Sequence, residues 1–270
     1  MTSKRIASKI SNRYTELLDL TTFPLENLYF ETNEFEIQQG NKTIKYYKVN
    51  IGAKQKGGIG EFVFNLPQFC HSFGVDEFQN EQGKATSHSV SLSMLDKNMT
   101  EEEQREQLGM IEAFGKFIER VKEHLFSIKK EIKKPTLDKS DLKTFNPMHQ
   151  ALDEDGNPKG NAWYFSPKLI ERKIYNKEDP SDVQTKMETT FYVDGQEDEK
   201  GNPVEISPLE FLGKKHFKFR GAIKVESVYV GAKITLQCKV YDGLVRQVAM
   251  ERKRLTTSKM SHDEMLLDDE

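Results

Sequence analysis

Alternating apolar and polar positions predict β-strands in the first third of the chain. Along residues 43–53, Tyr, Val and Ile recur at every second position, which indicates a strand with one apolar and one wet face. A basic, glycine-rich stretch at 54–60 predicts a turn, and residues 61–66 resume the strand pattern. These segments form a predicted hairpin, and residues 88–95 predict a further strand.

The period then changes to that of a helix. From Thr100 to about Lys134, apolar residues recur at spacings of three and four. Thr100 and Glu103 have the spacing of a capping box, and lysines precede Pro135 as expected near a helix C-terminus. The predicted stripe consists of Leu108, Ile111, Phe114, Ile118, Val121, Leu125, Ile128 and Ile132.

Further strands are predicted toward the C-terminus. Residues 135–160 are polar and turn-rich and predict a connection, and residues 187–193 predict a strand. The strongest β pattern covers residues 216–229 and 232–241, joined at Gly231. In the last of these strands, the residues of the wet face, where we expect a ligand, are Lys233, Thr235, Gln237, Lys239 and Tyr241.

Composition excludes several classes of protein. The 270 residues can bury a full core, and an aromatic content of 10% argues against a wholly disordered chain. Two cysteines are too few for a disulfide framework or a four-thiolate zinc site. The sequence shows neither an apolar leader after Met1 nor an apolar run of membrane-spanning length. We therefore expect an intracellular protein with no membrane partner.

The charge is unevenly distributed. The formal net charge is −3, but residues 255–270 hold five acids and one lysine, so residues 1–254 sum to +1. A near-neutral body can still contain a basic groove, because binding follows local charge.

Catalytic motifs are absent from the sequence. It contains no Walker loop, G-x-S-x-G elbow, H-E-x-x-H or kinase signature, so we expect neither an enzyme nor a cofactor. Cys70 and His71 are neighbours that a strand would point to opposite faces, which favours structural roles over a thiolate–imidazole pair or a metal site.

Bases and aromatic residues alternate in several stretches, which is typical of proteins that hold single strands. Such proteins stack bases on flat side chains and bind phosphates with cations. For Phe217 and Phe219 a core position is favoured, and Trp163 fits stacking and packing equally well. The candidate nucleic-acid-binding residues are Tyr46, Lys48, Lys54, Lys56, Trp163, Tyr164, Lys168, Arg172, Lys173, Lys218, Arg220, Lys233, Lys239 and Tyr241.

The acidic C-terminus has two interpretations. It can mimic a polyanion, competing for the chain's own groove or docking replication proteins, or it can be a solvated end. The residues for the first interpretation are Asp263, Glu264, Leu266, Leu267, Asp268, Asp269 and Glu270.

Three segments, residues 44–66, 166–174 and 228–246, followed by the acidic tail, carry a family resemblance. The chain resembles the single-stranded-DNA-binding proteins of nucleo-cytoplasmic large DNA viruses, a group that includes an OB-fold protein of African swine fever virus. The resemblance implies an α+β fold: one domain at 1–254, an OB-fold-like β-barrel with a long helix inserted near 100–134 and extended loops. Residues 255–270 would then be a disordered, flexible acidic tail.

The same resemblance implies sequence-nonspecific binding of single-stranded DNA during viral replication, recombination or repair, in the host cytoplasm or at a viral replication site. Two alternatives stay open. The chain could be a viral structural or assembly protein that self-associates through aromatic faces, or a metal-dependent nuclease.

Overall fold

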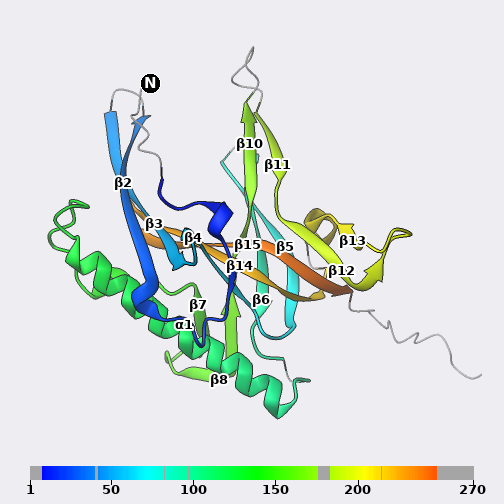
Figure 1. The fold of residues 1–270 in the computed structure, drawn as a ribbon. Coiled ribbons are helices and arrows are strands. Elements are labelled where there is room, and N and C mark those ends of the chain that lie inside the picture. The colour runs from blue at the N-terminus through cyan, green and yellow to red at the C-terminus, as the bar shows by residue number, and fades with distance from the viewer. Residues whose placement is uncertain are drawn as a thin grey trace, which may run out of the picture.

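The computed structural model describes residues 8–39, 42–81, 83–96, 98–175, 183–213 and 215–247. Within them the chain forms a 13-stranded mixed sheet, a separate two-stranded sheet and one α-helix (Figure 1). Short 3-10 helices lie at Asn12–Tyr14, Leu25–Asn27, Ser140–Leu142 and Pro208–Phe211. The strands are β1 (Leu17–Leu18), β2 (Leu28–Gln39), β3 (Lys42–Gln55), β4 (Gly58–Asn65), β5 (Cys70–Gln79), β6 (Ala85–Ser93), β7 (Met148–Leu152), β8 (Pro158–Phe165), β9 (Lys168–Leu169), β10 (Glu171–Tyr175), β11 (Val183–Met187), β12 (Thr190–Glu197), β13 (Pro203–Ile206), β14 (Phe217–Val230) and β15 (Ile234–Gln247).

The large sheet has the strand order β1-β4-β3-β14-β5-β6-β9-β15-β12-β13. Strand β2 adds to β3, and the β7–β8 hairpin adds to β6. Within the described residues, strands β10 and β11 pair only with each other, in the antiparallel register Glu171↔Met187 to Tyr175↔Val183. In Figure 1 the β2–β3 and β10–β11 hairpins rise from the same edge of the body.

The predicted hairpin at 43–66 is confirmed. Strands β3 and β4 pair antiparallel from Gly52↔Glu61 to Gln55↔Gly58, and Gly57 takes the positive φ of 98° that the tight turn needs. The two faces also separate as expected: Tyr47, Val49 and Ile51 are buried. The strands predicted at 88–95, 216–229 and 232–241 correspond to β6, β14 and β15.

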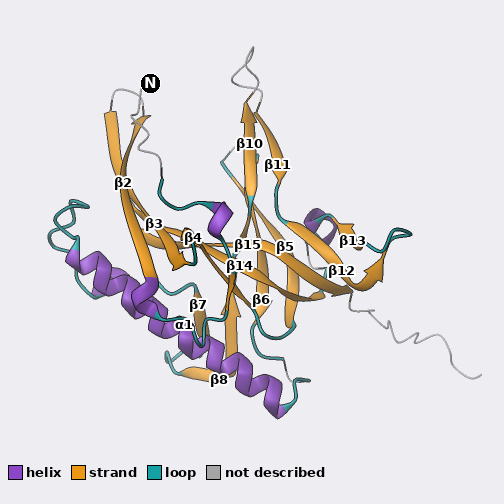
Figure 2. Cartoon of the chain, in the orientation of Figure 1, coloured by secondary structure: helices purple, strands orange, loops and turns teal. Residues whose placement is uncertain are grey.

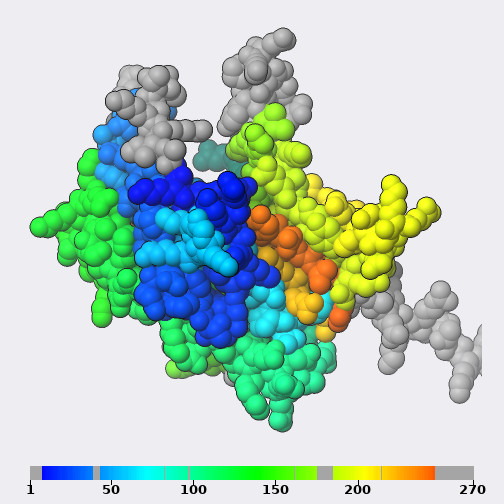
Figure 3. Space-filling view, viewed as in Figure 1, coloured from blue at the N-terminus to red at the C-terminus, as the bar shows by residue number. Residues whose placement is uncertain are grey.

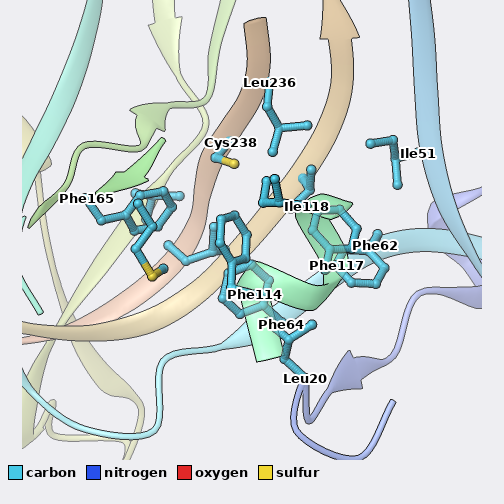
Figure 4. Close-up of a cluster of buried hydrophobic side chains, with 14 of the residues drawn as sticks. Leu20, Ile51, Phe62, Phe64, Phe114, Phe117, Ile118, Phe165, Leu236 and Cys238 are labelled. Carbon is cyan, nitrogen blue, oxygen red and sulfur yellow. The ribbon is translucent and has the colours of Figure 1, made fainter. Parts of the chain in front are cut away.

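The α-helix α1 (Glu101–Ser127) packs its apolar side against the sheet (Figure 2). Its N-terminus has the predicted capping box: Thr100 Oγ1 accepts from the Glu103 amide at 3.2 Å, and the Thr100 amide donates to the Glu103 carboxylate at 2.7 Å. Aromatic rings fill the interface, as Figure 4 shows. Phe117 stacks on Phe62 with ring centroids 4.8 Å apart, and Phe114 lies 5.6 Å from Phe64.

The expected α+β fold with an OB-like barrel is wrong. An OB-fold is a five-stranded barrel, whereas the described residues are mostly strand and form a large mixed sheet with a single α-helix. The helix is not an insert in a barrel but a layer on one face of this sheet. The long strands β3, β14 and β15 each pair with more than one partner, which a periodicity argument does not capture.

Three local predictions are also corrected. The helix ends at Ser127 rather than near Lys134, and Leu108 is 42% exposed because Gln107 and Met110 occupy its place in the buried stripe. The connection at 135–160 contains β7 and the start of β8. The single strand at 187–193 is two strands, β11 and β12, with Glu188 and Thr189 between them.

Residues 255–270 lie outside the described part of the chain, and so do all the tail residues proposed to bind the groove or partners. None of the described helices is both long and apolar enough to span a membrane.

The helix–sheet interface gives the first prediction. Replacing Phe114 with Ala should lower the free energy of unfolding by about 3–5 kcal/mol, because the ring is fully buried between Phe64, Phe117 and Phe165. Urea unfolding followed by circular dichroism measures the change.

The matched control is Leu108→Ala on the same helix, where the exposed side chain predicts a change within about 0.5 kcal/mol. Equal losses for the two variants would contradict the packing described above.

Candidate nucleic-acid interface

A groove of about 520 Å³ lies on the wet face of the sheet, between β3 and the β10–β11 hairpin. We call it the lysine–tyrosine groove. Figure 3 shows the two hairpins standing apart above the body. The groove is lined by Tyr46, Lys48, Thr86, Ser87, Lys168, Leu169, Glu171, Lys173, Glu226, Ser227, Tyr229, Gln237 and Lys239.

Strand alternation puts these side chains on one surface. Tyr46 and Lys48 leave β3 on the face opposite buried Tyr47 and Val49. Strand β14 pairs with β3 in the register Tyr229↔Lys48, which places Tyr229 diagonally next to Tyr46. Residues of β15 and β9 continue the same surface toward the β10–β11 hairpin.

Aromatic rings form a row along one side of the groove. The rings of Tyr46 and Tyr229 are 5.1 Å apart and tilted by 38°, and Phe35 stacks on the other side of Tyr46 at 5.3 Å. Phe35 and Tyr229 are each 37% exposed. Flat rings that are partly exposed beside cations can stack unpaired bases.

Positive charge predominates in the groove, where four lysines outnumber two glutamates and leave a formal net charge of +2. Lys48 and Lys239 contact the two oxygens of the Glu226 carboxylate, at 3.4 and 3.1 Å. Among the described residues, neither Lys168 nor Lys173 has a carboxylate within ion-pair distance. These two lysines are therefore available to an anion.

One further polar group in the groove lacks a partner. The Ser227 hydroxyl is buried and lines the groove, yet it makes no hydrogen bond to any described residue. Buried hydroxyl groups are usually satisfied, so this one is an available donor or acceptor for a bound ligand.

Buried and partly buried hydrogen bonds anchor the wall that carries Lys168 and Lys173. Glu171 accepts from the His88 ring at 2.7 Å and from the His88 amide at 2.9 Å, which ties the base of β10 to β6. Thr189 Oγ1 accepts from the Ile170 amide and donates to the Val240 carbonyl, both at 2.7 Å. These contacts fix β9 and β10 against β15.

The structure brings five of the predicted site residues into the groove: Tyr46, Lys48, Lys168, Lys173 and Lys239. Sequence reasoning did not select Tyr229. Regular alternation would put it on the same face as the buried Phe217 and Phe219, and the bulge in β14 reverses that phase. A signal was the position of Tyr229 two residues before Gly231, at the end of a strongly alternating strand. Phe35 was missed because β2 was not predicted.

Other predicted residues are exposed but lie outside the groove. Lys54 and Lys56 are at the β3–β4 turn, and Lys233 lies in the β14–β15 turn. Tyr241 is 38% exposed but does not line the groove. Arg172 points away from Lys173 and lies 4.0 Å from Glu188.

Four predicted residues belong to a different part of the surface. Trp163 is partly buried and packs against the core, and Tyr164 lies near Phe73. Lys218 pairs with Asp96 at 3.4 Å. The Arg220 guanidinium stacks over Phe69 at 4.9 Å.

The cysteine neighbours separate as predicted. Cys70 is fully buried, and burial raises the pKa of its thiol to about 12, so the thiolate is scarce near neutral pH. His71 turns outward, and its Nε2 lies 3.1 Å from Nδ1 of His216.

Phe217 and Phe219 are fully buried, in agreement with the prediction that they are core residues. Among the residues in the described ranges, no group of three His, Cys, Asp or Glu side chains could hold a metal ion.

Comparison with known proteins gives a family but no named activity. Residues 28–266 match the family "Protein of unknown function (DUF2738)", and the chain belongs to it. No curated protein matches the sequence. Among solved structures, the chain is similar to gp2.5, a single-stranded DNA binding protein encoded by bacteriophage T7. The identity is 12% and the TM-score 0.36, over 70% of this chain and 88% of that one.

This structural similarity is too low to support an argument about function. Neither match bears on the resemblance to proteins of large DNA viruses, which stays a prediction.

The anchoring of the groove wall can be tested with His88→Ala. The variant leaves Glu171, a nearly buried carboxylate, without its ring partner, so the free energy of unfolding should fall by about 1–3 kcal/mol. Amide hydrogen exchange in β10 and β11 should accelerate more than in β14. His149→Ala is the control, since His149 is exposed and has no carboxylate partner among the described residues. Unchanged exchange in β10 would contradict the anchoring role of His88.

Proposed function

We propose that this member of the DUF2738 family binds single-stranded DNA with little sequence preference in the lysine–tyrosine groove. The observation that carries the proposal is the Tyr46–Tyr229 ring pair, which lies beside four lysines on one open surface. Stacking needs bases that are not already stacked in a duplex, so the aromatic row favours single strands. Lysines that contact phosphates bind any sequence.

Two groove features fit this proposal better than a small-molecule site. The groove is open and has lysines on both sides, Lys48 on β3 and Lys173 on β10, as a strand passing between two hairpins would require. A second hollow of similar volume, about 550 Å³ between β1 and α1, has two acids and no lysine or arginine among its lining residues. A polyanion would be repelled there.

We also propose an intracellular, non-enzymatic role in viral DNA replication, recombination or repair. The family resemblance and the lack of catalytic motifs support this role.

The rival function, an assembly protein, is favoured by exposed Ile37 and Ile44 near Phe35 on the β2–β3 hairpin. Self-association through these apolar side chains would persist at high salt, whereas DNA binding would weaken. Sedimentation velocity at low and high salt separates the two functions.

The DNA proposal predicts specific effects of groove tyrosines. Tyr46→Ala and Tyr229→Ala should each weaken oligo(dT) binding by about 1–3 kcal/mol, because each ring removed takes away one stacking platform. Fluorescence anisotropy of a labelled oligonucleotide at two salt concentrations measures the affinity. For three or four lysine–phosphate contacts, log K should fall with log salt at a slope of about −2 to −3.

The matched control is Tyr241→Ala, which removes an equally exposed tyrosine outside the groove and should leave the affinity unchanged. No binding by the unmodified protein at low salt would refute the proposed function.

We further propose that the acidic residues 263–270 compete with DNA for the same lysines. Removal of residues 256–270 eliminates a net charge of −4, so a chain ending at Leu255 should bind oligo(dT) more tightly, most clearly at low salt. The same anisotropy titration measures this. Equal affinities for the full and shortened chains would count against competition by the tail.

A further inference from the structure

Glu226 occupies a special position in the sheet. Strand β14 pairs with β4 through Val225↔Phe62 and with β3 from Ser227↔Asn50 onward. Opposite β15, the register shifts between Val225↔Cys238 and Ser227↔Gln237, which leaves Glu226 as the extra residue of a β-bulge. Glu226 therefore lies where β14 changes partners.

The bulge changes which side chains share a face. Two residues three positions apart point to opposite sides of a regular strand. Glu226 and Tyr229 nevertheless both line the groove, together with Ser227, whereas Val228 is buried in the core. The bulge turns the carboxylate toward the aromatic row, a use of bulges that is common beside functional sites.

Once there, the carboxylate contacts two of the four groove lysines. Its Oε1 lies 3.4 Å from Lys48 Nζ, and its Oε2 lies 3.1 Å from Lys239 Nζ. All three side chains are only 23–31% exposed. Burial opposes ionisation of Glu226, but the ammonium groups of Lys48, Lys239 and, less strongly, Lys224 outweigh it and lower the pKa of the carboxyl. The group is therefore an anion at neutral pH.

We propose that Glu226 is a specificity-determining residue of the groove: its carboxylate occupies Lys48 and Lys239 in the free protein, and a DNA phosphate must displace it. This inference rests on the proposed function. The geometry supports it, because a carboxylate bridging two lysines satisfies the same cations that a backbone phosphate would contact. Lys168 and Lys173, which have no such partner among the described residues, make the first contacts.

This arrangement limits which anions can displace Glu226 from Lys48 and Lys239. An isolated anion can contact Lys168 or Lys173. It gains no binding free energy at Lys48 and Lys239, because there it would only replace the Glu226 carboxylate with another anion. A nucleic acid strand brings phosphates together with bases that stack on Tyr46 and Tyr229, so it can displace Glu226. Binding is consequently weaker, and more easily reversed, than four free lysines would give.

The test compares Glu226→Gln with Glu61→Gln. Glutamine keeps the size of the side chain and removes the charge. Glu61 is the matched control, because its carboxylate also pairs with a lysine, Lys224, at similar exposure, and neither residue lines the groove. Oligo(dT) affinity is measured by anisotropy over a series of salt concentrations, and melting temperatures confirm that both variants fold.

E226Q should bind roughly 2- to 30-fold more tightly than the unmodified protein, since two partly exposed ion pairs no longer compete. The salt slope should stay at about −2 to −3, because the bound strand contacts the same four lysines in both proteins. E61Q should change neither the affinity nor the slope. Glu226→Ala, which also removes the charge, should bind more tightly as well and covers the case in which E226Q folds poorly.

Weaker binding by E226Q would overturn the inference, because Glu226 would then be needed to position the lysines. Unchanged binding would overturn it too. In both cases the unmodified protein still binds oligo(dT), so the proposed function survives. Only the absence of binding by the unmodified protein would refute that function.

Discussion

The pairing of β14 with four other strands is the constraint on which the rest of the structure depends. Strand β14 follows β15 from Phe217↔Gln247 to Val230↔Ile234. Along its other edge it pairs in turn with β5, β4 and β3. Two register shifts opposite β15 make these exchanges possible. Without them, the segments that supply the core and the groove would not meet on one sheet.

This constraint divides the sheet into a packed face and a wet face. On the packed face, aromatic side chains of α1 meet Phe62 and Phe64 of β4. Burial of apolar surface of this kind is the main driving force for folding. The wet face is then held rigid by strands whose other side is fully packed. Tyr46 and Tyr229 can be partly exposed without collapsing onto the body, because their neighbours Tyr47 and Val228 anchor the backbone.

Periodicity predicted the elements with long, regular patterns. The 27-residue α1, the β3–β4 hairpin and the β14–β15 pair follow directly from spacing, turn residues and the capping box. Strands of two to five residues, such as β1, β9 and β10, carry too few positions for a period to be visible. The prediction of the overall fold, an OB-like barrel, was wrong for a related reason. Partner exchange along β14 depends on long-range pairing, and no local pattern encodes it.

The candidate site was predictable only in part for the same reason. Alternation placed Tyr46, Lys48 and Lys239 on wet faces, and the structure puts them in one groove. Arg220 and Lys218 also alternate with buried residues, but the strand carries them to a region where Phe69 and Asp96 contact them. Sequence spacing determines which face a residue occupies, whereas strand order determines which residues become neighbours.

The charge of the groove also follows from strand order. The chain as a whole is acidic, yet β3, β15 and the segment from β9 to β10 each supply lysines to the same surface. A cluster of four lysines would repel itself, and Glu226 relieves this repulsion by bridging two of them. The carboxylate thus stabilises the free protein. Under the proposed function it does so at the expense of affinity for DNA, and the bulge that places this acid among the cations couples the stability of the empty groove to the release of DNA.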